Sequence, residues 1–185
     1  GFSRQTYEIG SPVNNLVAAD FDLDGDVDIA GTEGQVGSDV EVYYNNGNGV
    51  FGLIEGAYVG PFPKDLVAVD VDGDEYIDLI MESDLGLVLL RNDGSRFADG
   101  DGLFADPVEV IYDQTLVSYV DVGDIDADGS PDLYASGGTA TSLVFLNDGS
   151  GQFADSLVGP PVGPFPTLGD FDDDGDLDLA SRGEN

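Results

Sequence analysis

The sequence of 185 residues contains no cysteine, no histidine and no tryptophan. The missing cysteines exclude disulfide bonds and thiolate metal sites. The missing histidines remove the most common general base, most zinc and copper sites, and any nucleophile that depends on a Ser-His or Cys-His pair. Any chemistry of this chain therefore rests on carboxylates, hydroxyls, tyrosines and a few cationic side chains.

Positive charge is also scarce, with five lysine and arginine residues against 38 acidic residues and a formal net charge of −33. Such a charge repels nucleic acid and anionic membrane surfaces, so we expect no nucleic-acid partner, and cations are the natural partners. The longest apolar run, residues 85–90, is far below membrane-spanning length, so we expect no membrane insertion. A hydrophobic content of 41% argues against disorder.

Aspartate is abundant and is concentrated in four short stretches. These read DFDLDGDVD from Asp20, DVDGDEYID from Asp70, DIDADGSPD from Asp124 and DFDDDGDLD from Asp170. Their first aspartates are separated by 50, 54 and 46 residues, which identifies the chain as a repeat protein.

A second motif recurs in phase with the first: YYNNGNGVF at 43–51, LLRNDGSRF at 89–97 and FLNDGSGQF at 145–153. Each reads as a strand, a tight Asn-Gly or Asp-Gly turn and an aromatic residue. With the short apolar segments on both sides of each acidic stretch, every unit is predicted to hold about four short antiparallel strands. The fold class is therefore all-β, and a β-propeller of about four ~50-residue, four-stranded blades is favoured over a β-sandwich.

We expect one repeat domain over residues 1–185, with units at about 11–60, 61–107, 108–160 and 161–185 and an additional N-terminal strand at 1–10. The fourth unit lacks the strand that precedes the Asn-Gly turn in the other units. The chain is therefore interpreted as a segment of a longer repeat array, or as a subunit that another copy completes.

Metal binding explains why like charges are crowded in each acidic stretch. Alternate side chains of an extended segment point the same way, so Asp20, Asp22 and Asp24 can converge on one point. Gly25 permits a reversal, which brings the carbonyl of Asp26 and the side chain of Asp28 to that point. Six or seven hard oxygen ligands are what Ca²⁺ requires, whereas Mg²⁺ demands tighter octahedral geometry.

The pattern of aspartate at positions 1, 3, 5 and 9 with glycine at position 6 recurs in the other loops. The second loop has Glu75 in place of the glycine and Gly73 two places earlier, so we expect it to be distorted. An EF-hand is excluded because it requires a glutamate at position 12 and flanking helices. The predicted side-chain ligands of the last three loops are Asp70, Asp72, Asp74 and Asp78; Asp124, Asp126, Asp128 and Asp132; and Asp170, Asp172, Asp174 and Asp178.

The combination of LVAADFDLDGDVDIA with YYNNGNGVF closely resembles the FG-GAP/VCBS repeat, which occurs in the propeller heads of integrin α-subunits and in many large secreted bacterial proteins. The resemblance covers nearly the whole chain. It implies a β-propeller whose calcium loops join the first two strands of each blade, with a position-7 carbonyl as a further ligand. On this sequence those carbonyls belong to Asp26, Tyr76, Ser130 and Asp176.

These features predict a secreted, calcium-binding repeat protein that acts in adhesion or as a structural subunit of an extracellular assembly or filament. Its expected partners are calcium, a protein or glycan surface, and other copies of itself. The alternative is a carbohydrate-binding or carbohydrate-active propeller module. We expect no enzymatic activity, because most conspicuous aspartates are committed to calcium and no glutamate pair shares a pattern. The repeated Gly-Pro-Phe-Pro at 60–63 and 163–166 is interpreted as a rigid link with its aromatic residue packed inward.

Overall fold

The computed structural model describes residues 6, 13–33, 39–84, 86–94, 109–112, 117–137, 142–153, 157–159 and 166–182. Every regular element among these residues is a β-strand, which confirms the predicted all-β class. In this part of the chain, no helix is present that has the length and apolar character to cross a membrane.

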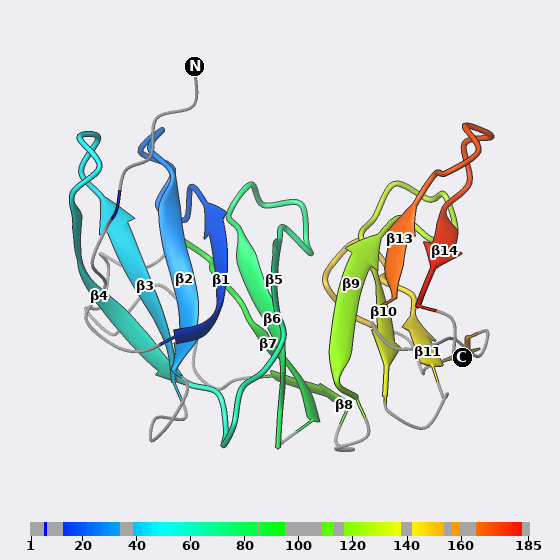
Figure 1. The fold of residues 1–185 in the computed structure, drawn as a ribbon. Coiled ribbons are helices and arrows are strands. Elements are labelled where there is room, and N and C mark those ends of the chain that lie inside the picture. The colour runs from blue at the N-terminus through cyan, green and yellow to red at the C-terminus, as the bar shows by residue number, and fades with distance from the viewer. Residues whose placement is uncertain are drawn as a thin grey trace.

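The strands form successive antiparallel sheets in which sequence order equals spatial order (Figure 1). The first sheet contains β1 (Val13–Ala19), β2 (Asp28–Glu33), β3 (Asp39–Asn45) and β4 (Phe51–Tyr58). The second contains β5 (Leu66–Val69), β6 (Asp78–Ser83), β7 (Gly86–Leu90) and β8 (Glu109–Tyr112). The third contains β9 (Tyr119–Gly123), β10 (Asp132–Ser136), β11 (Ser142–Phe145) and β12 (Leu157–Val158), and the fourth contains β13 (Thr167–Gly169) and β14 (Asp178–Ala180).

Each acidic stretch is the loop between the first two strands of a sheet, so the four loops occupy equivalent places. In the second sheet every residue of β6 and β7 is buried, and β7 and the 79–81 part of β6 are apolar on both faces. A strand that lies between two neighbouring sheets has no solvent-facing side, and its sequence is then nearly continuous in apolar residues. By contrast, β1 alternates between half-buried and exposed residues.

Asparagine and glycine form the turn after the third strand, as predicted. The N–H of Asn46 donates to the carbonyl of Val50 at 3.2 Å, and the N–H of Asp148 donates to that of Gln152 at 3.1 Å. Gly47 has a φ of 79°, a backbone conformation that residues with a Cβ rarely adopt. The predicted strand–turn–strand reading is therefore confirmed where the turn is described.

The first strands of the sheets are neighbours: β1 contacts β5, β5 contacts β9, and β9 contacts β13. Side-chain carboxylates connect these strands. The N–H of Val120 donates to Asp65 at 3.0 Å, and the N–H of Leu168 donates to Asp121 at 2.8 Å. These bonds connect the second sheet to the third and the third sheet to the fourth at their first strands.

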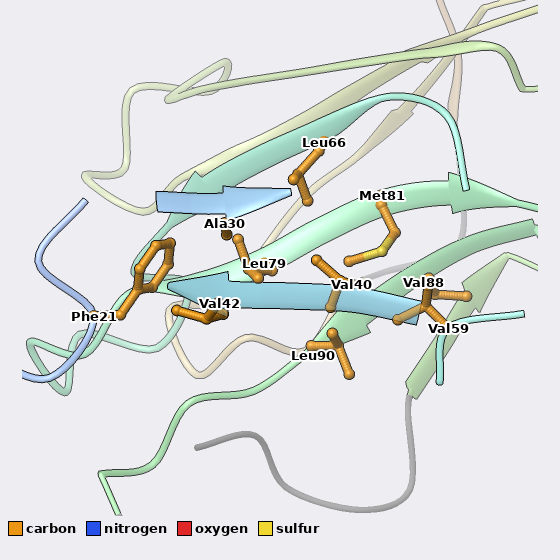
Figure 2. Close-up of a cluster of buried hydrophobic side chains, with 10 residues drawn as sticks. All are labelled: Phe21, Ala30, Val40, Val42, Val59, Leu66, Leu79, Met81, Val88 and Leu90. Carbon is orange, nitrogen blue, oxygen red and sulfur yellow. The ribbon is translucent and has the colours of Figure 1, made fainter. Parts of the chain in front are cut away.

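The hydrophobic cores lie between adjacent sheets. Figure 2 shows the first, in which Phe21, Ala30, Val40 and Val42 of the first sheet meet side chains of the second, with Val59 on the link between the two. The second core lies between the second and third sheets. Residues of the second sheet alternate between the two cores: Leu79 and Met81 belong to the first, whereas Ile80 belongs to the second. Sheet-to-sheet packing is therefore the main source of apolar burial.

Three sequence expectations meet the structure differently. The unit boundary predicted after residue 107 divides the second sheet, because β8 pairs with β7 and the sheet extends to Tyr112. The side chain of Phe62 is 67% exposed, with a φ of 55°, so the prediction that it packs inward is wrong. Phe62 lies directly between two prolines in a turn with left-handed φ, where its ring is exposed to solvent. The strand predicted at 1–10 and the second Gly-Pro-Phe segment lie outside the described residues.

Candidate metal centres

Three aspartates of every loop are brought together, those at positions 1, 3 and 9. In each loop, one carboxylate oxygen from each of the three residues lies within 4.8 Å of the others. The four groups are Asp20, Asp22 and Asp28; Asp70, Asp72 and Asp78; Asp124, Asp126 and Asp132; and Asp170, Asp172 and Asp178. Of the predicted side-chain ligands, those at positions 1, 3 and 9 are therefore brought together in all four repeats, whereas the position-5 aspartate is not among them.

The aspartate at position 9 links the loop to the turn after the third strand. In the first loop, Oδ2 of Asp28 accepts the N–H of Phe21 at 3.0 Å, and Oδ1 accepts the N–H of Asn45 at 2.8 Å. The same two bonds recur around Asp78 and around Asp132. All three carboxylates are buried. At Asp28 and Asp78 each oxygen accepts one of these bonds and retains a lone pair for a cation, whereas Oδ2 of Asp132 also accepts the N–H of Asp126 at 3.3 Å.

The aspartate at position 1 shapes the loop itself. Asp20 accepts the N–H of Asp24 at 3.1 Å through Oδ1 and the N–H of Gly25 at 2.9 Å through Oδ2. Equivalent bonds are made by Asp124 and Asp170. The tight backbone reversal is therefore held by a carboxylate that also belongs to the acidic group.

The reversal requires positive φ at positions 4 and 6. In the first loop these are Leu23 at 57° and Gly25 at 94°. In the second loop Gly73 has a φ of 76° and Glu75 a φ of 78°. Every loop therefore contains one glycine and one other residue in this region, and the second loop exchanges their places. The expected distortion is confined to one hydrogen bond, because Asp70 accepts the N–H of Gly73 and not that of Asp74.

Positions 5 and 7 are bonded to each other and stand outside the three-carboxylate groups. Oδ1 of Asp24 accepts the N–H of Asp26 at 2.9 Å. The same bond joins Asp74 to Tyr76, Asp128 to Ser130, and Asp174 to Asp176. The ligand roles predicted for these position-5 side chains and position-7 carbonyls stay predictions.

Burial and like charge make the position-9 carboxylates of the first two loops, Asp28 and Asp78, costly to ionise. Burial raises the pKa of Asp78 to about 7, although N–H donors from Val71 and Asn92 act in the opposite direction; the charges of Asp72 and Asp74 raise it further. Burial likewise raises the pKa of Asp28 above its usual value. A bound cation would offset the cost of holding several carboxylates in one place.

The donor set fits calcium. All four groups offer carboxylate oxygens only. Such hard oxygen ligands suit Ca²⁺ and Mg²⁺ better than they suit transition metals such as zinc or copper. In the second loop, Oδ1 of Asp72 is buried and accepts no hydrogen bond within the described part of the chain. Its lone pairs are therefore available to a cation. When bound, Ca²⁺ would supply charge neutralisation and cross-linking of the loop, and the position 1, 3 and 9 aspartates would hold it.

One loop also contacts a protein cation. Nη1 of Arg91 lies 2.8 Å from Oδ2 of Asp72, and Nη2 donates to the carbonyl of Gly151 on the third sheet at 2.6 Å. The guanidinium thus joins the second loop to the neighbouring turn. The first and third loops have Tyr44 and Leu146 at the corresponding position in sequence, before the turn asparagine, so this link is particular to the second repeat.

Sequence reasoning missed the role of the turn asparagine, which is Asn45, Asn92 or Asn147 in the three complete sheets. The N–H of each donates to the position-9 aspartate of its own sheet. The amide of Asn92 also donates to the carbonyl of Phe21 in the preceding loop at 2.8 Å, and that of Asn147 donates to Val71 at 2.7 Å. The asparagine recurs at the same place in the NNG and NDG motifs of the three repeats, which could have indicated this role, but the motifs were interpreted only as turns.

Repeated antiparallel sheets with an aspartate-rich loop after each first strand define the chain as an all-β repeat protein. The family model described as an FG-GAP-like repeat matches residues 20–81, 70–135 and 124–181. The chain therefore belongs to the FG-GAP-like repeat family, which confirms the resemblance seen in the sequence. No curated protein matched the chain.

Among solved structures, the chain is similar to an Agrocybe aegerita lectin whose structure is described as the basis of specific recognition of non-reducing terminal N-acetylglucosamine. The TM-score is 0.57 at 23% identity, over 80% of this chain and 38% of the lectin chain. It also matches the Photorhabdus luminescens Tc holotoxin pore with a TM-score of 0.39 at 20% identity, over 72% of this chain and 6% of that one. The chain thus spans well under half of either protein, and the likeness to the lectin shows the fold alone.

Proposed function

We propose that this protein binds calcium in all four loops and uses the bound ions to stiffen a repeat array. The observation that carries the proposal is the recurrence of the same three-carboxylate group, within 4.8 Å, in every repeat. A single acidic cluster is a common surface feature, whereas four copies with the same backbone bonds to position 1 point to one shared ligand. Calcium is favoured over magnesium because it accepts a loose, high-coordination oxygen shell.

We further propose that the sheets are blades of a β-propeller. Three features support this arrangement: four-stranded antiparallel sheets with sequential strand order, contacts between successive first strands, and cores between adjacent sheets. In a propeller, the first strand of each blade lies nearest the axis, and the blades pack face to face around it.

The proposed role is binding and assembly outside the cell, in adhesion or as a structural subunit of an extracellular assembly or filament. A charge of −33 disfavours nucleic-acid and anionic membrane partners. Extracellular calcium at millimolar concentration would keep even weak loops filled, which favours a secreted protein. No catalytic role is proposed, because the acidic clusters among the described residues are the ones assigned here to calcium.

A carbohydrate-binding module is the second candidate, favoured by the likeness in fold to a glycan-recognising lectin. A glycan array probed in calcium separates the two candidates. Saturable binding to one class of sugar favours the lectin-like role, and the absence of glycan binding by a calcium-loaded protein favours adhesion to proteins or assembly.

Chelation tests the calcium proposal. An ion that binds only the folded chain stabilises it by about 2.7 kcal/mol per site at a hundredfold excess over its dissociation constant. We expect the melting temperature, followed by far-ultraviolet circular dichroism, to fall sharply when EDTA removes calcium and to recover when calcium is restored. Magnesium at the same concentration serves as the control and is expected to restore less. Identical melting curves with calcium and with EDTA would refute the proposal.

A further inference from the structure

The guanidinium of Arg91, directly after β7, lies between the second loop and the third sheet. Its Nη1 is 2.8 Å from Oδ2 of Asp72, the position-3 aspartate of the loop, and donates to the carbonyl of Ser150 at 3.3 Å. Its Nη2 donates to the carbonyl of Gly151 at 2.6 Å. Two carbonyls of the neighbouring turn therefore hold this cation beside an aspartate of the candidate metal group.

A glycine in the neighbouring turn leaves room for the guanidinium. A Cβ added to Gly151 would lie 2.5 Å from Nη1 of Arg91, which is closer than real Cβ atoms approach another atom. The φ of Gly151 is 71°, so the turn itself also favours a residue without a Cβ. The guanidinium thus packs directly on the backbone of the third sheet, and its place does not depend on Asp72 alone.

The ion pair is largely shielded from solvent, since the side chain of Arg91 is 18% exposed and that of Asp72 is 26% exposed. Partly buried charges are screened less by salt than charges on an open surface. Asp72 also belongs to the three-carboxylate group of its loop. A metal ion in this group would meet one ligand whose charge is already compensated, and a fixed positive charge beside it would repel the ion.

This positive charge is particular to the second repeat. The residue before the turn asparagine is Tyr44 in the first repeat and Leu146 in the third, and neither is a cation. The rest of the group is built alike, because Asp78 accepts the same two backbone N–H bonds as Asp28 and Asp132. The arginine is therefore a local addition to a carboxylate group that all repeats share.

We propose that Arg91 lowers the calcium affinity of the second loop by competing with the ion for Asp72. The inference rests on the proposed calcium function and adds a control on one of its sites. The second loop releases its ion more readily than it would with an uncharged residue at position 91, and the guanidinium compensates part of the loop charge once calcium has left. Because coupling between two sites is reciprocal, calcium in this loop weakens the pairing of Arg91 with Asp72 by the same factor.

The test measures calcium binding by equilibrium dialysis, with circular dichroism to verify the fold of each variant. Arg91→Leu replaces the cation with the residue type that the third repeat has at this place, and Arg91→Lys keeps the positive charge. Arg182→Leu is the matched control, because it removes the same charge from an exposed residue outside the acidic stretches. Each variant is also combined with Asp70→Asn, which disables the second loop and so assigns any change to that loop.

We expect Arg91→Leu to raise the calcium affinity of one site by about fivefold or more. Arg91→Lys should keep the weaker binding of the unmodified chain, since the charge carries the effect, and Arg182→Leu should change no site. In combination with Asp70→Asn, Arg91→Leu should no longer alter calcium binding. Equal affinity in Arg91→Leu and the unmodified chain, or an equal rise in Arg91→Lys, would overturn the inference and leave the proposed function standing.

Thermal unfolding distinguishes this role from that of a purely structural link between sheets. Arg91→Leu should lower the melting temperature more in EDTA than in saturating calcium, because the calcium-free loop loses its cation whereas the loaded loop gains affinity for calcium. An equal loss in both conditions is what a structural link would give, and it would overturn the inference. Absence of calcium binding by the unmodified chain would refute the proposed function itself.

Discussion

Replacement of the turn asparagine tests whether it connects neighbouring sheets. In Asn92→Ala, the chain loses the amide bonds to the carbonyls of Phe21 at 2.8 Å and Ile77 at 3.3 Å. Asn45→Ala is the matched control, because Asn45 makes the corresponding bond within its own sheet, to Val27 at 3.1 Å, and none to a preceding loop in the described chain. The difference between the two variants isolates the contact between sheets.

The expected loss in the free energy of unfolding depends on how deeply each asparagine is buried. A typical hydrogen bond contributes a net ~1 kcal/mol to stability, and a buried carbonyl left without a donor costs a further ~1 to 3 kcal/mol. Asn92 is 1% exposed, so no water readily replaces its amide, whereas Asn45 is half-buried at the first sheet. We expect Asn45→Ala to lower the free energy of unfolding by about 1 kcal/mol and Asn92→Ala by about 2 to 3 kcal/mol more.

The assay is urea unfolding in saturating calcium, followed by circular dichroism and by tyrosine fluorescence, because the chain has no tryptophan. Asn147→Ala repeats the experiment at the next interface, where the amide donates to Val71 at 2.7 Å, and the same excess cost is expected. Equal destabilisation by Asn45→Ala and Asn92→Ala would refute the reasoning, since the bond between sheets would then contribute nothing.

Two further predictions concern backbone strain and buried charge. Gly25→Ala should lower the free energy of unfolding, measured by urea titration, by about 1 to 2 kcal/mol. The φ of Gly25 is 94° and an added Cβ meets nothing within 4 Å, so the cost is that of the backbone conformation alone. Gly52→Ala is the control, because Gly52 is equally open and has no positive φ, and it should change the free energy of unfolding by less than about 0.5 kcal/mol. An equal effect at both glycines would contradict the strain argument. Burial raises the pKa of Glu82 above 4.5, and Lys64 at 2.9 Å lowers it only in part. The folded chain therefore binds this proton more tightly than the unfolded chain, and the resulting stability is lost as pH rises through the folded pKa. The unfolding free energy of the unmodified chain, relative to that of Glu82→Gln, should therefore fall as the pH rises above the usual glutamate pKa of 4.5, and a difference that stays constant with pH would contradict the assignment.

The periodic sequence predicted the strands, turns and acidic loops of each repeat, because these features depend on residues that are close together in the sequence. Alternation in an extended segment predicted that the aspartates at positions 1 and 3 lie together, and the reversal at position 6 predicted that position 9 joins them; position 5, which was expected there too, is not in the group. Positive φ at Gly25, and at the Asn-Gly turn glycine Gly47, follows from the absence of a Cβ. These are short-range effects, and the sequence shows them directly.

What the sequence did not reveal depends on the neighbouring sheet. Asn92 looks like a turn former, and only the packing of two sheets shows that its amide reaches Phe21. Glu75 looked disruptive, but Gly73 takes over one of the two positive φ angles and the loop keeps its shape. Phe62 resembled a core residue but is 67% exposed, in a turn where its φ is 55°.

The number of calcium ions per chain tests the central claim most directly. Native mass spectrometry in calcium acetate, with elemental analysis of the same sample, should find four Ca²⁺ per chain, one for each carboxylate group. Asp172→Asn, which neutralises one exposed ligand of the fourth loop, should lower the count to three and leave the other loops filled. A chain without bound calcium, or an unchanged count in Asp172→Asn, would contradict the account.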